Sequence, residues 1–309
     1  MIDKTSVCVL MSTYNGEKYL REQIDSILNQ KGDFVMKLLV RDDGSNDSTK
    51  DILNEYAGVY KNVSWYGGHN LGSTWSFFAL LDQAPEANYY AFSDQDDFWL
   101  PNKLEAAINS IDTDKEPVLY SCKKEIVDRN LKKLNRDDAV PEKGLLNALY
   151  KQNKASGCTM VFNHSMKQML LKHRIREKND FMYHDSWAYK VAELYGKNIY
   201  DANKYMLYRQ HGNNVVGAID TGISRLMKKI ANFNIRRSMD SHIAYAYALE
   251  LSKSVDDSLP SEKARILDCV VQGRTSFTKR MRLVCIPGID ISPVWEYVWI
   301  KLKMILGWY

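Results

Sequence analysis

Short apolar runs alternate with amphipathic segments along the first hundred residues. The apolar runs have the length of strands, and the segments between them repeat apolar residues every three or four positions, which is typical of helices. This alternation predicts a parallel sheet whose faces are covered by helices, an α/β fold. The predicted strands are 6–11, 36–40, 63–66 and 89–92, and the predicted helices are 17–28, 49–56, 74–83 and 101–110.

A polar loop follows each of these four strands. The loops are rich in hydroxyl, amide, glycine and carboxylate groups, and they comprise residues 12–16, 41–48, 67–73 and 93–99. Ligands of open α/β sheets bind outside the carboxyl ends of the strands, and all four loops lie at that edge in this arrangement. The sequence therefore predicts that four polar clusters converge on one cleft.

The fourth loop carries three carboxylates within four residues, Asp94, Asp96 and Asp97. Carboxylates this close together repel one another unless a cation lies between them. Hard oxygen ligands at this density suit Mg2+ or Mn2+, which proteins hold with one or two carboxylates together with substrate phosphates. The alternative is an acidic turn in which Asp97 caps the following helix.

The alternation weakens after residue 100, and the chain becomes purely helical near residue 218. The sequence predicts further strands at 117–122, 156–162 and 204–209 and further helices at 144–151, 165–173 and 186–195. Residues 125–138 are charged and are predicted to form a hairpin or loop. We therefore expect a catalytic domain over residues 1–217 and a helical C-terminal region over residues 218–309.

The amino-acid composition indicates a globular protein and limits the kinds of site it can carry. The 309 residues are 45% hydrophobic and 26% charged, which is typical of one large or two modest globular domains. The five cysteines are scattered and predict neither a disulfide framework nor a thiolate zinc site. The start of the chain has no features of a signal peptide, so we expect a cytoplasmic protein. Residues 218–309 hold 14 Lys and Arg against 9 Asp and Glu, so the basic character belongs to the C-terminal region.

The four loops resemble those of the GT-A fold glycosyltransferases of family 2. The matching segments are Ser12-Thr13-Tyr14-Asn15-Gly16, Asp42-Asp43-Gly44-Ser45-Asn46-Asp47, Asn70-Leu71-Gly72 and Asp94-Gln95-Asp96-Asp97. Two later segments, His184-Asp185-Ser186-Trp187 and 208–215, resemble the bacterial rhamnosyltransferase-like branch. The resemblance spans residues 5–217. It implies a GT-A, Rossmann-like, mostly parallel sheet, with a nucleotide-sugar half over about residues 1–100 and an acceptor half over about residues 101–217.

The resemblance also implies which residues hold the nucleotide. An acidic residue after the second strand, Asp42 or Asp43, would accept a hydrogen bond from the base, because only an acceptor satisfies a buried imide N–H. A plain turn is the alternative for this segment. The other residues implied to bind the nucleotide are Thr13, Tyr14, Asn15, Asn70 and Asp94.

Metal, catalytic and acceptor roles follow from the same resemblance. Asp94, Asp96 and His211 are the implied ligands of Mg2+ or Mn2+. Asp185 is the implied catalytic base, and its alternative is a helix cap. The residues expected to face the acceptor or the diphosphate are His184, Arg209 and Trp99, although His184 could also tune Asp185 or pack, and Trp99 could pack beneath the loop.

The end of the chain predicts an amphipathic helix. Apolar residues at 295, 298, 299, 302, 305, 306 and 309 fall on one helical face, and basic residues accompany them. Such a helix is typical of the surface of an anionic membrane. Packing against the catalytic domain or in a homodimer is the alternative. Nucleic acid is not an expected partner, because the basic residues lack a recognisable binding module.

Together these patterns predict an inverting, metal-dependent glycosyltransferase of bacterial surface polysaccharide synthesis. Branch resemblance implies transfer of L-rhamnose from dTDP-L-rhamnose, a nucleotide-sugar donor, to a glycan or lipid-linked acceptor. A UDP-hexose donor is one alternative. A non-catalytic nucleotide-sugar or glycan-binding module is another, and the carboxylates Asp94, Asp96 and Asp185 argue against it. A dinucleotide-dependent enzyme is excluded, because no GxGxxG follows the first strand.

Overall fold

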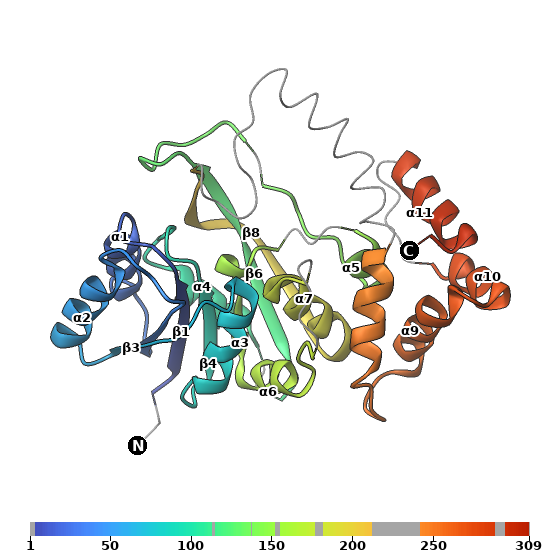
Figure 1. Cartoon of the computed structure of the whole chain (residues 1–309), viewed down its shortest axis with the longest axis horizontal. Coiled ribbons are helices and arrows are strands. Elements are labelled where there is room, and N and C mark those ends of the chain that lie inside the picture. Colours follow the sequence, from blue (N-terminus) through green and yellow to red (C-terminus); the bar gives the residue numbers. More distant parts are fainter. Residues whose placement is uncertain are drawn as a thin grey trace.

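A computed structural model shows an eight-stranded mixed sheet with helices on both faces (Figure 1). The strand order is β3-β2-β1-β4-β7-β6-β8-β5. The structure describes residues 4–112, 115–136, 138–151, 155–176, 182–211, 242–287 and 294–308.

The first half of the sheet is parallel, as the sequence predicts. Its strands are β1 (Ser6–Thr13), β2 (Val35–Asp42), β3 (Val63–Gly67) and β4 (Tyr89–Ser93). β1 pairs with both β2 and β4, and β2 pairs with β3, all in parallel. The carboxyl ends of β1, β2 and β4 therefore lie side by side, and the loops that follow them share one edge.

The second half of the sheet contains antiparallel pairs. Its strands are β5 (Phe98–Trp99), β6 (Val118–Val127), β7 (Val161–Asn163) and β8 (Lys197–Arg209). β7 runs antiparallel to β4 and β6, β5 runs antiparallel to β8, and β6 and β8 are parallel. The strand predicted at 156–162 is wrong in its first part, where a 3-10 helix (Gly157–Thr159) precedes the shorter β7.

Helices cover the two faces of the sheet, and the side chains of β1 alternate between them. Cys8 and Leu10 pack with α3 (Ser73–Gln83), α5 (Leu145–Tyr150), α6 (His164–Lys172) and α7 (His184–Tyr195). Val7, Val9 and Met11 pack with α1 (Leu20–Leu28), α2 (Thr49–Val59) and α4 (Lys103–Ser110). The two-residue period of β1 thus separates two apolar layers.

The C-terminal helices extend the layer that contains α7. They are the helix 242–252, α9 (Ser261–Gly273), α10 (Phe277–Cys285) and α11 (Val294–Leu306). Tyr247, Val270, Leu283 and Met304 belong to the same continuous core as Trp187 of α7. These helices lie at the end of the molecule opposite α1 and α2 (Figure 1).

Packing against the catalytic domain, one of the alternatives for the C-terminal region, is therefore found for the described helices. Among the described residues, no helix combines the length and hydrophobicity needed to cross a bilayer.

Candidate active site

Gln95 joins the loop after β4 to the loop after β1. Its Oε1 accepts hydrogen bonds from Thr13 Oγ1 at 2.5 Å and from the Tyr14 backbone N–H at 2.8 Å, and its Nε2 donates to the Tyr14 carbonyl at 3.1 Å. Thr13 is buried and Tyr14 is exposed. A Cβ at Gly16 would lie 2.3 Å from Gln95 Oε1, so any other residue there would displace the Gln95 side chain. Sequence reasoning missed Gln95, although it stands between two predicted ligands.

Asn15 joins the loop after β1 to the loop after β2. It adopts a left-handed conformation with φ of 48°, its Oδ1 accepts from the Asn46 N–H at 2.9 Å, and its own N–H donates to Ser45 Oγ at 2.8 Å. Asparagine tolerates this conformation better than most residues. The polar residues of the first two loops are thus held in one unit.

Asp42 and Asp43 are both buried, and protein groups surround their oxygens. Asp42 Oδ2 accepts from the Ser45 N–H at 3.0 Å and the Gly44 N–H at 3.2 Å, which is the geometry of the turn considered as the alternative. Asp43 pairs with Arg41 and accepts from the Gly72 N–H at 2.9 Å. Asp43 thereby anchors the third loop, in which Asn70 is exposed. A hydrogen bond from a nucleotide base to either carboxylate stays a prediction.

Asp96 and His211 come together from positions far apart in the chain. His211 Nε2 lies 2.8 Å from Asp96 Oδ2, and the imidazole stacks on Tyr19 with ring centroids 5.1 Å apart. Both side chains are largely but not completely buried. A carboxylate and an imidazole that converge at this edge of the sheet form a donor set that Mn2+ accepts.

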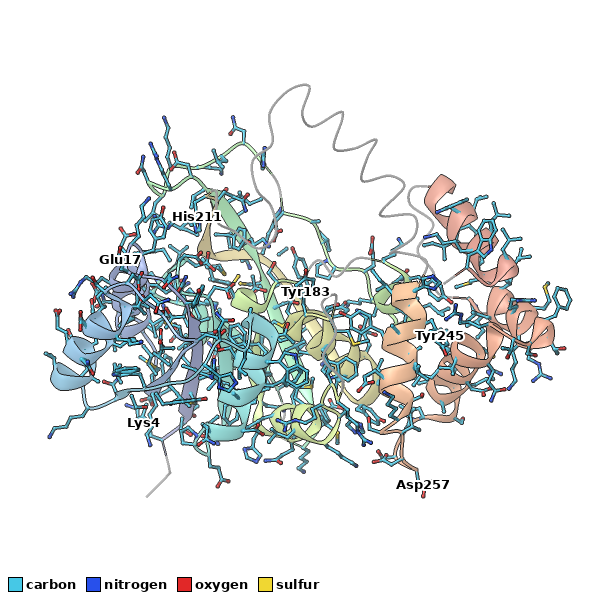
Figure 2. All side chains as sticks on the ribbon, viewed as in Figure 1. Lys4, Glu17, Tyr183, His211, Tyr245 and Asp257 are labelled. Atoms are coloured by element: carbon cyan, nitrogen blue, oxygen red, sulfur yellow. The ribbon has the colours of Figure 1, made fainter. Side chains whose placement is uncertain are left out.

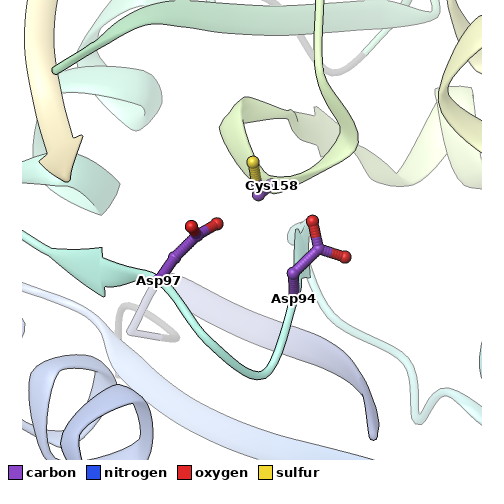
Figure 3. A group of neighbouring side chains, drawn as sticks. All are labelled: Asp94, Asp97 and Cys158. Carbon is purple, nitrogen blue, oxygen red and sulfur yellow. The ribbon is translucent and has the colours of Figure 1, made fainter. Parts of the chain in front are cut away.

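Asp94 and Asp97 face the thiol of Cys158 from the loop after β4 (Figure 3). One ligand atom of each residue lies within 4.8 Å of the others. Asp97 is fully buried; its Oδ1 accepts from the Arg209 N–H at 3.2 Å, and its Oδ2 has no partner of normal geometry among the described residues. The cap alternative for Asp97 is wrong, because α4 begins at Lys103 and its N-cap is Asn102.

Burial and neighbouring carboxylates raise the pKa of Asp94 and of Asp97. Burial is the largest cause, and the charges of Asp96 and Asp185 add to it, so the pKa of Asp94 is raised to about 7. Burial, with the charges of Asp96 and Asp94, also holds the pKa of Asp97 well above its usual value. A divalent cation would relieve this repulsion. Among the described residues, the group whose candidate ligand atoms lie within 4.8 Å of one another is Asp94, Asp97 and Cys158. The oxygen and imidazole donors of Asp94, Asp96 and His211 are of the type that Mg2+ or Mn2+ accepts, but joint binding of a metal by these three residues stays a prediction.

Arg209 and Trp99 are buried beneath this loop. The Arg209 guanidinium donates from Nε to the Asp96 carbonyl at 2.8 Å, pairs with Glu22, and stacks on Tyr19 at 4.4 Å. The indole of Trp99 is 1% exposed and lies under the Lys103 ammonium, 3.2 Å from the ring centroid. In this structure both residues support the loop, which is the packing alternative for Trp99. Contact of either with diphosphate or acceptor stays a prediction.

Asp185 lies in the first turn of α7. The helix begins two residues earlier than predicted and has Tyr183 as its N-cap, so Asp185 is not the cap. Its Oδ1 accepts from the Ser186 N–H at 2.6 Å and its Oδ2 from the Gly157 N–H at 3.2 Å. These two backbone donors fix the orientation of the carboxylate.

His184, beside Asp185, is buried among aromatic rings. Its imidazole stacks on Phe77 with centroids 3.9 Å apart and meets Phe92 edge-on at 5.2 Å. Neither ring nitrogen has a hydrogen-bond partner among the described residues. Burial lowers the pKa of His184 to about 4, although the charge of Asp185 opposes this shift. The imidazole is therefore neutral at physiological pH.

The helix 242–252 reaches the same turn of α7. Tyr247 hydrogen-bonds with the Ser186 side chain and the Tyr183 backbone. Its ring also lies 3.9 Å from the buried ammonium of Lys190, which donates to Ser186 Oγ at 2.7 Å. In Figure 2, Tyr183 lies between His211 and the helix that carries Tyr245. Sequence reasoning assigned no role to Tyr247 or Lys190, because their partners lie on another helix or in the protein interior.

Comparison with known proteins identifies the family of this arrangement. The family model described as "Glycosyl transferase family 2" matches residues 8–196, which contain all four loops and Asp185. The chain belongs to glycosyl transferase family 2. It is 31% identical over 229 residues to the dTDP-rhamnosyl transferase RfbG of Shigella flexneri, a match that covers 67% of this chain and 74% of that protein. The chain is thus a glycosyltransferase with a rhamnosyltransferase among its relatives.

Solved structures support the GT-A fold of this family 2 glycosyltransferase. Residues 1–349 of S. aureus TarS, in complex with UDP-GlcNAc, match with a TM-score of 0.58 at 18% identity, over 99% of this chain and 82% of that chain. The mannosyltransferase PcManGT from Pyrobaculum calidifontis, in complex with GDP-Man and Mn2+, matches with a TM-score of 0.52 at 15% identity, over 97% and 85%. At these identities the likeness concerns the fold alone.

Proposed function

We propose that this glycosyltransferase moves L-rhamnose from dTDP-L-rhamnose to a hydroxyl of a glycan or lipid-linked acceptor, with inversion at the anomeric carbon. The reaction would belong to bacterial surface polysaccharide synthesis at the inner face of the cytoplasmic membrane. One observation supports the transferase chemistry. Asp96 and His211 lie in contact after the strands of the sheet, while Asp185 lies at the start of a separate helix, α7. The similarity to RfbG supports the choice of donor.

The residues of the fourth loop would receive the donor diphosphate. Asp94, Asp96 and His211 would hold Mg2+ or Mn2+, and the ion supplies Lewis-acid stabilisation of the departing nucleoside diphosphate. Gln95 keeps the first loop fixed against these ligands through its contact with Thr13. The nucleotide would therefore contact backbone and side-chain groups that are already held in position.

Asp185 would take the proton of the acceptor hydroxyl. Single displacement with inversion needs a carboxylate on the face of the sugar opposite the diphosphate. The Gly157 and Ser186 N–H groups each occupy one oxygen of Asp185 and hold the carboxylate in place. Each carboxylate oxygen has two lone pairs, so an oxygen that accepts one backbone hydrogen bond can still accept a proton.

A UDP-hexose donor is the second candidate. The TarS neighbour in complex with UDP-GlcNAc favours it, although that protein shares only 18% of its residues with this chain. A non-catalytic module is a weaker alternative, because the family relationship comes with carboxylates at all three positions, Asp94, Asp96 and Asp185. The nucleotide that binds separates the two donors.

Calorimetry of dTDP and UDP binding, with and without Mn2+, tests the proposal. We expect dTDP to bind more tightly than UDP, and Mn2+ to strengthen binding in the wild type but not in Asp96→Asn. Asp33→Asn is the matched control, since the Asp33 side chain is 94% exposed and pairs only with Lys4 among the described residues. Tighter binding of UDP would favour the hexose donor. Failure of both nucleotides to bind would overturn the transferase proposal.

A further inference from the structure

α11 packs on the rest of the protein with one face and leaves apolar side chains on the other. Ile300 and Met304 are buried in the core. Five apolar side chains at the end of the chain are between 37% and 48% exposed, and they are Val298, Leu302, Ile305, Leu306 and Trp308. Positions 298, 302, 305 and 306 of the apolar face predicted from periodicity therefore face solvent, and a second set of apolar residues holds the helix in place.

The exposed residues of α11 form a stripe bordered by lysines. At about 100° per residue, Val298, Leu302, Ile305 and Leu306 span an arc of about 100°. Lys301 and Lys303 fall on either side of this arc. Lys303 in this position can keep its ammonium group in the headgroup layer while the apolar stripe enters the acyl boundary. The Lys301 ammonium donates to the carbonyls of Val284 and Ile286 and so stays on the protein.

α10 extends this face. Arg280 of α10 lies against the end of α11, because a Cβ at Gly307 would come within 2.7 Å of its Nη1. The same guanidinium lies 5.8 Å from the ring centroid of Phe277, which is 63% exposed. Phe277, the α11 residues Val298, Leu302, Ile305 and Leu306, and Trp308 beyond the end of α11 are together called the C-terminal apolar surface.

The charge around the C-terminal apolar surface has one sign. Residues 277–287 and 294–308 contain five cationic residues and a single acidic one, Glu296. Lys279 is partly neutralised by an ion pair with Asp268. Arg282 is exposed on α10. An apolar stripe within a basic surround complements a layer of anionic headgroups over hydrocarbon.

We propose that the C-terminal apolar surface docks on an anionic lipid bilayer. A second copy of the chain fits less well, because a two-fold contact through this face would bring the cations of one copy against those of the other. The proposal deepens the proposed function, since it names the surface on which a lipid-linked acceptor would be met. Binding would be reversible and weakened by salt, as expected for one short interfacial helix pair.

Vesicle flotation of the full-length protein, without nucleotide or acceptor, tests the proposal. We expect flotation with vesicles of phosphatidylcholine and phosphatidylglycerol, and much less with phosphatidylcholine alone or at high salt. Val298→Glu should lower the partition coefficient by about tenfold or more, because a charge enters the apolar stripe. Val59→Glu is the matched control, since Val59 is 70% exposed at the end of α2, far from this surface, and it should float like the wild type.

Equal flotation of the two variants, or absence of flotation of the wild type, would overturn the proposal. A dimer in light scattering that Val298→Glu converts to a monomer, without flotation of the wild type, would assign the surface to a second copy. Circular dichroism checks that both variants fold. Nucleotide calorimetry on the same samples distinguishes failure of this proposal from failure of the proposed function. A protein that binds dTDP but no vesicles would overturn membrane docking and leave the proposed function standing.

Discussion

Acidification should destabilise this protein through His184. The imidazole is held between Phe77 and Phe92 with no hydrogen-bond partner among the described residues, so a proton on it would be a buried charge. Replacement by phenylalanine keeps an aromatic ring between these neighbours and removes the titration. The pair of wild type and His184→Phe therefore isolates the contribution of this one group.

The magnitude follows from the pKa. The pKa of His184 falls from 6.5 to about 4 on folding, mainly through burial. Between these two values the unfolded chain binds the proton and the folded chain does not, so stability rises with pH across this window and is lost as the pH falls. A difference of roughly 2.5 pKa units corresponds to about 3 kcal/mol in the free energy of unfolding.

Urea denaturation of both proteins at about pH 7 and about pH 4.5 measures this difference. The wild type should lose about 2.5 kcal/mol more than His184→Phe between these two conditions. Carboxylates elsewhere titrate in both proteins and cancel in the comparison. Equal losses would show that the imidazole is hydrated or paired in the folded state, and the reasoning from burial would then be wrong.

Two further predictions concern the surroundings of Asp185. Asp185→Asn should lower sugar transfer by about 100-fold or more while the donor still binds, and full turnover in a dTDP-release assay would remove its role as base. Gly157→Ala places a Cβ 2.5 Å from His184 Nε2 and 3.4 Å from Asp185 Cβ, so it should cost about 1–3 kcal/mol in thermal unfolding and slow transfer. Gly58→Ala is its control, since no atom lies within 4 Å of the added methyl group, and equal behaviour of the two variants would contradict this account.

Local periodicity was sufficient to predict the first half of the fold. The runs that became β1 and β4 are apolar over a strand length, the run that became β2 is apolar apart from Lys37, and polar turns end all three. The second half depends on distant pairing. β5 has only two residues and is held by β8 more than a hundred positions later, so no local pattern predicts it. Gly157 begins a 3-10 turn inside a run that looks like a strand.

The site was predictable where side-chain chemistry and strand ends coincide. Asp94, Asp96 and Asp185 are conspicuous in sequence because carboxylates follow apolar runs or begin a helix. The sequence does not show in the same way which side chains are buried and already paired. Arg209 resembles a ligand for phosphate, yet its guanidinium is committed to Glu22 and backbone carbonyls. Side chains that orient others through tertiary contacts carry no local signal.

The contact of Tyr247 with the first turn of α7 limits how this protein can be divided. The helix 242–252 supplies a hydroxyl to Ser186, which follows Asp185, and a ring to Lys190, one turn further along α7. A chain shortened to residue 217 would expose Trp187 and leave the Lys190 ammonium without its aromatic neighbour. Exchange of C-terminal regions between relatives would then alter the surroundings of Asp185 as well as the C-terminal apolar surface. We expect α7 of the catalytic domain and the helix 242–252 of the C-terminal region to vary together in evolution.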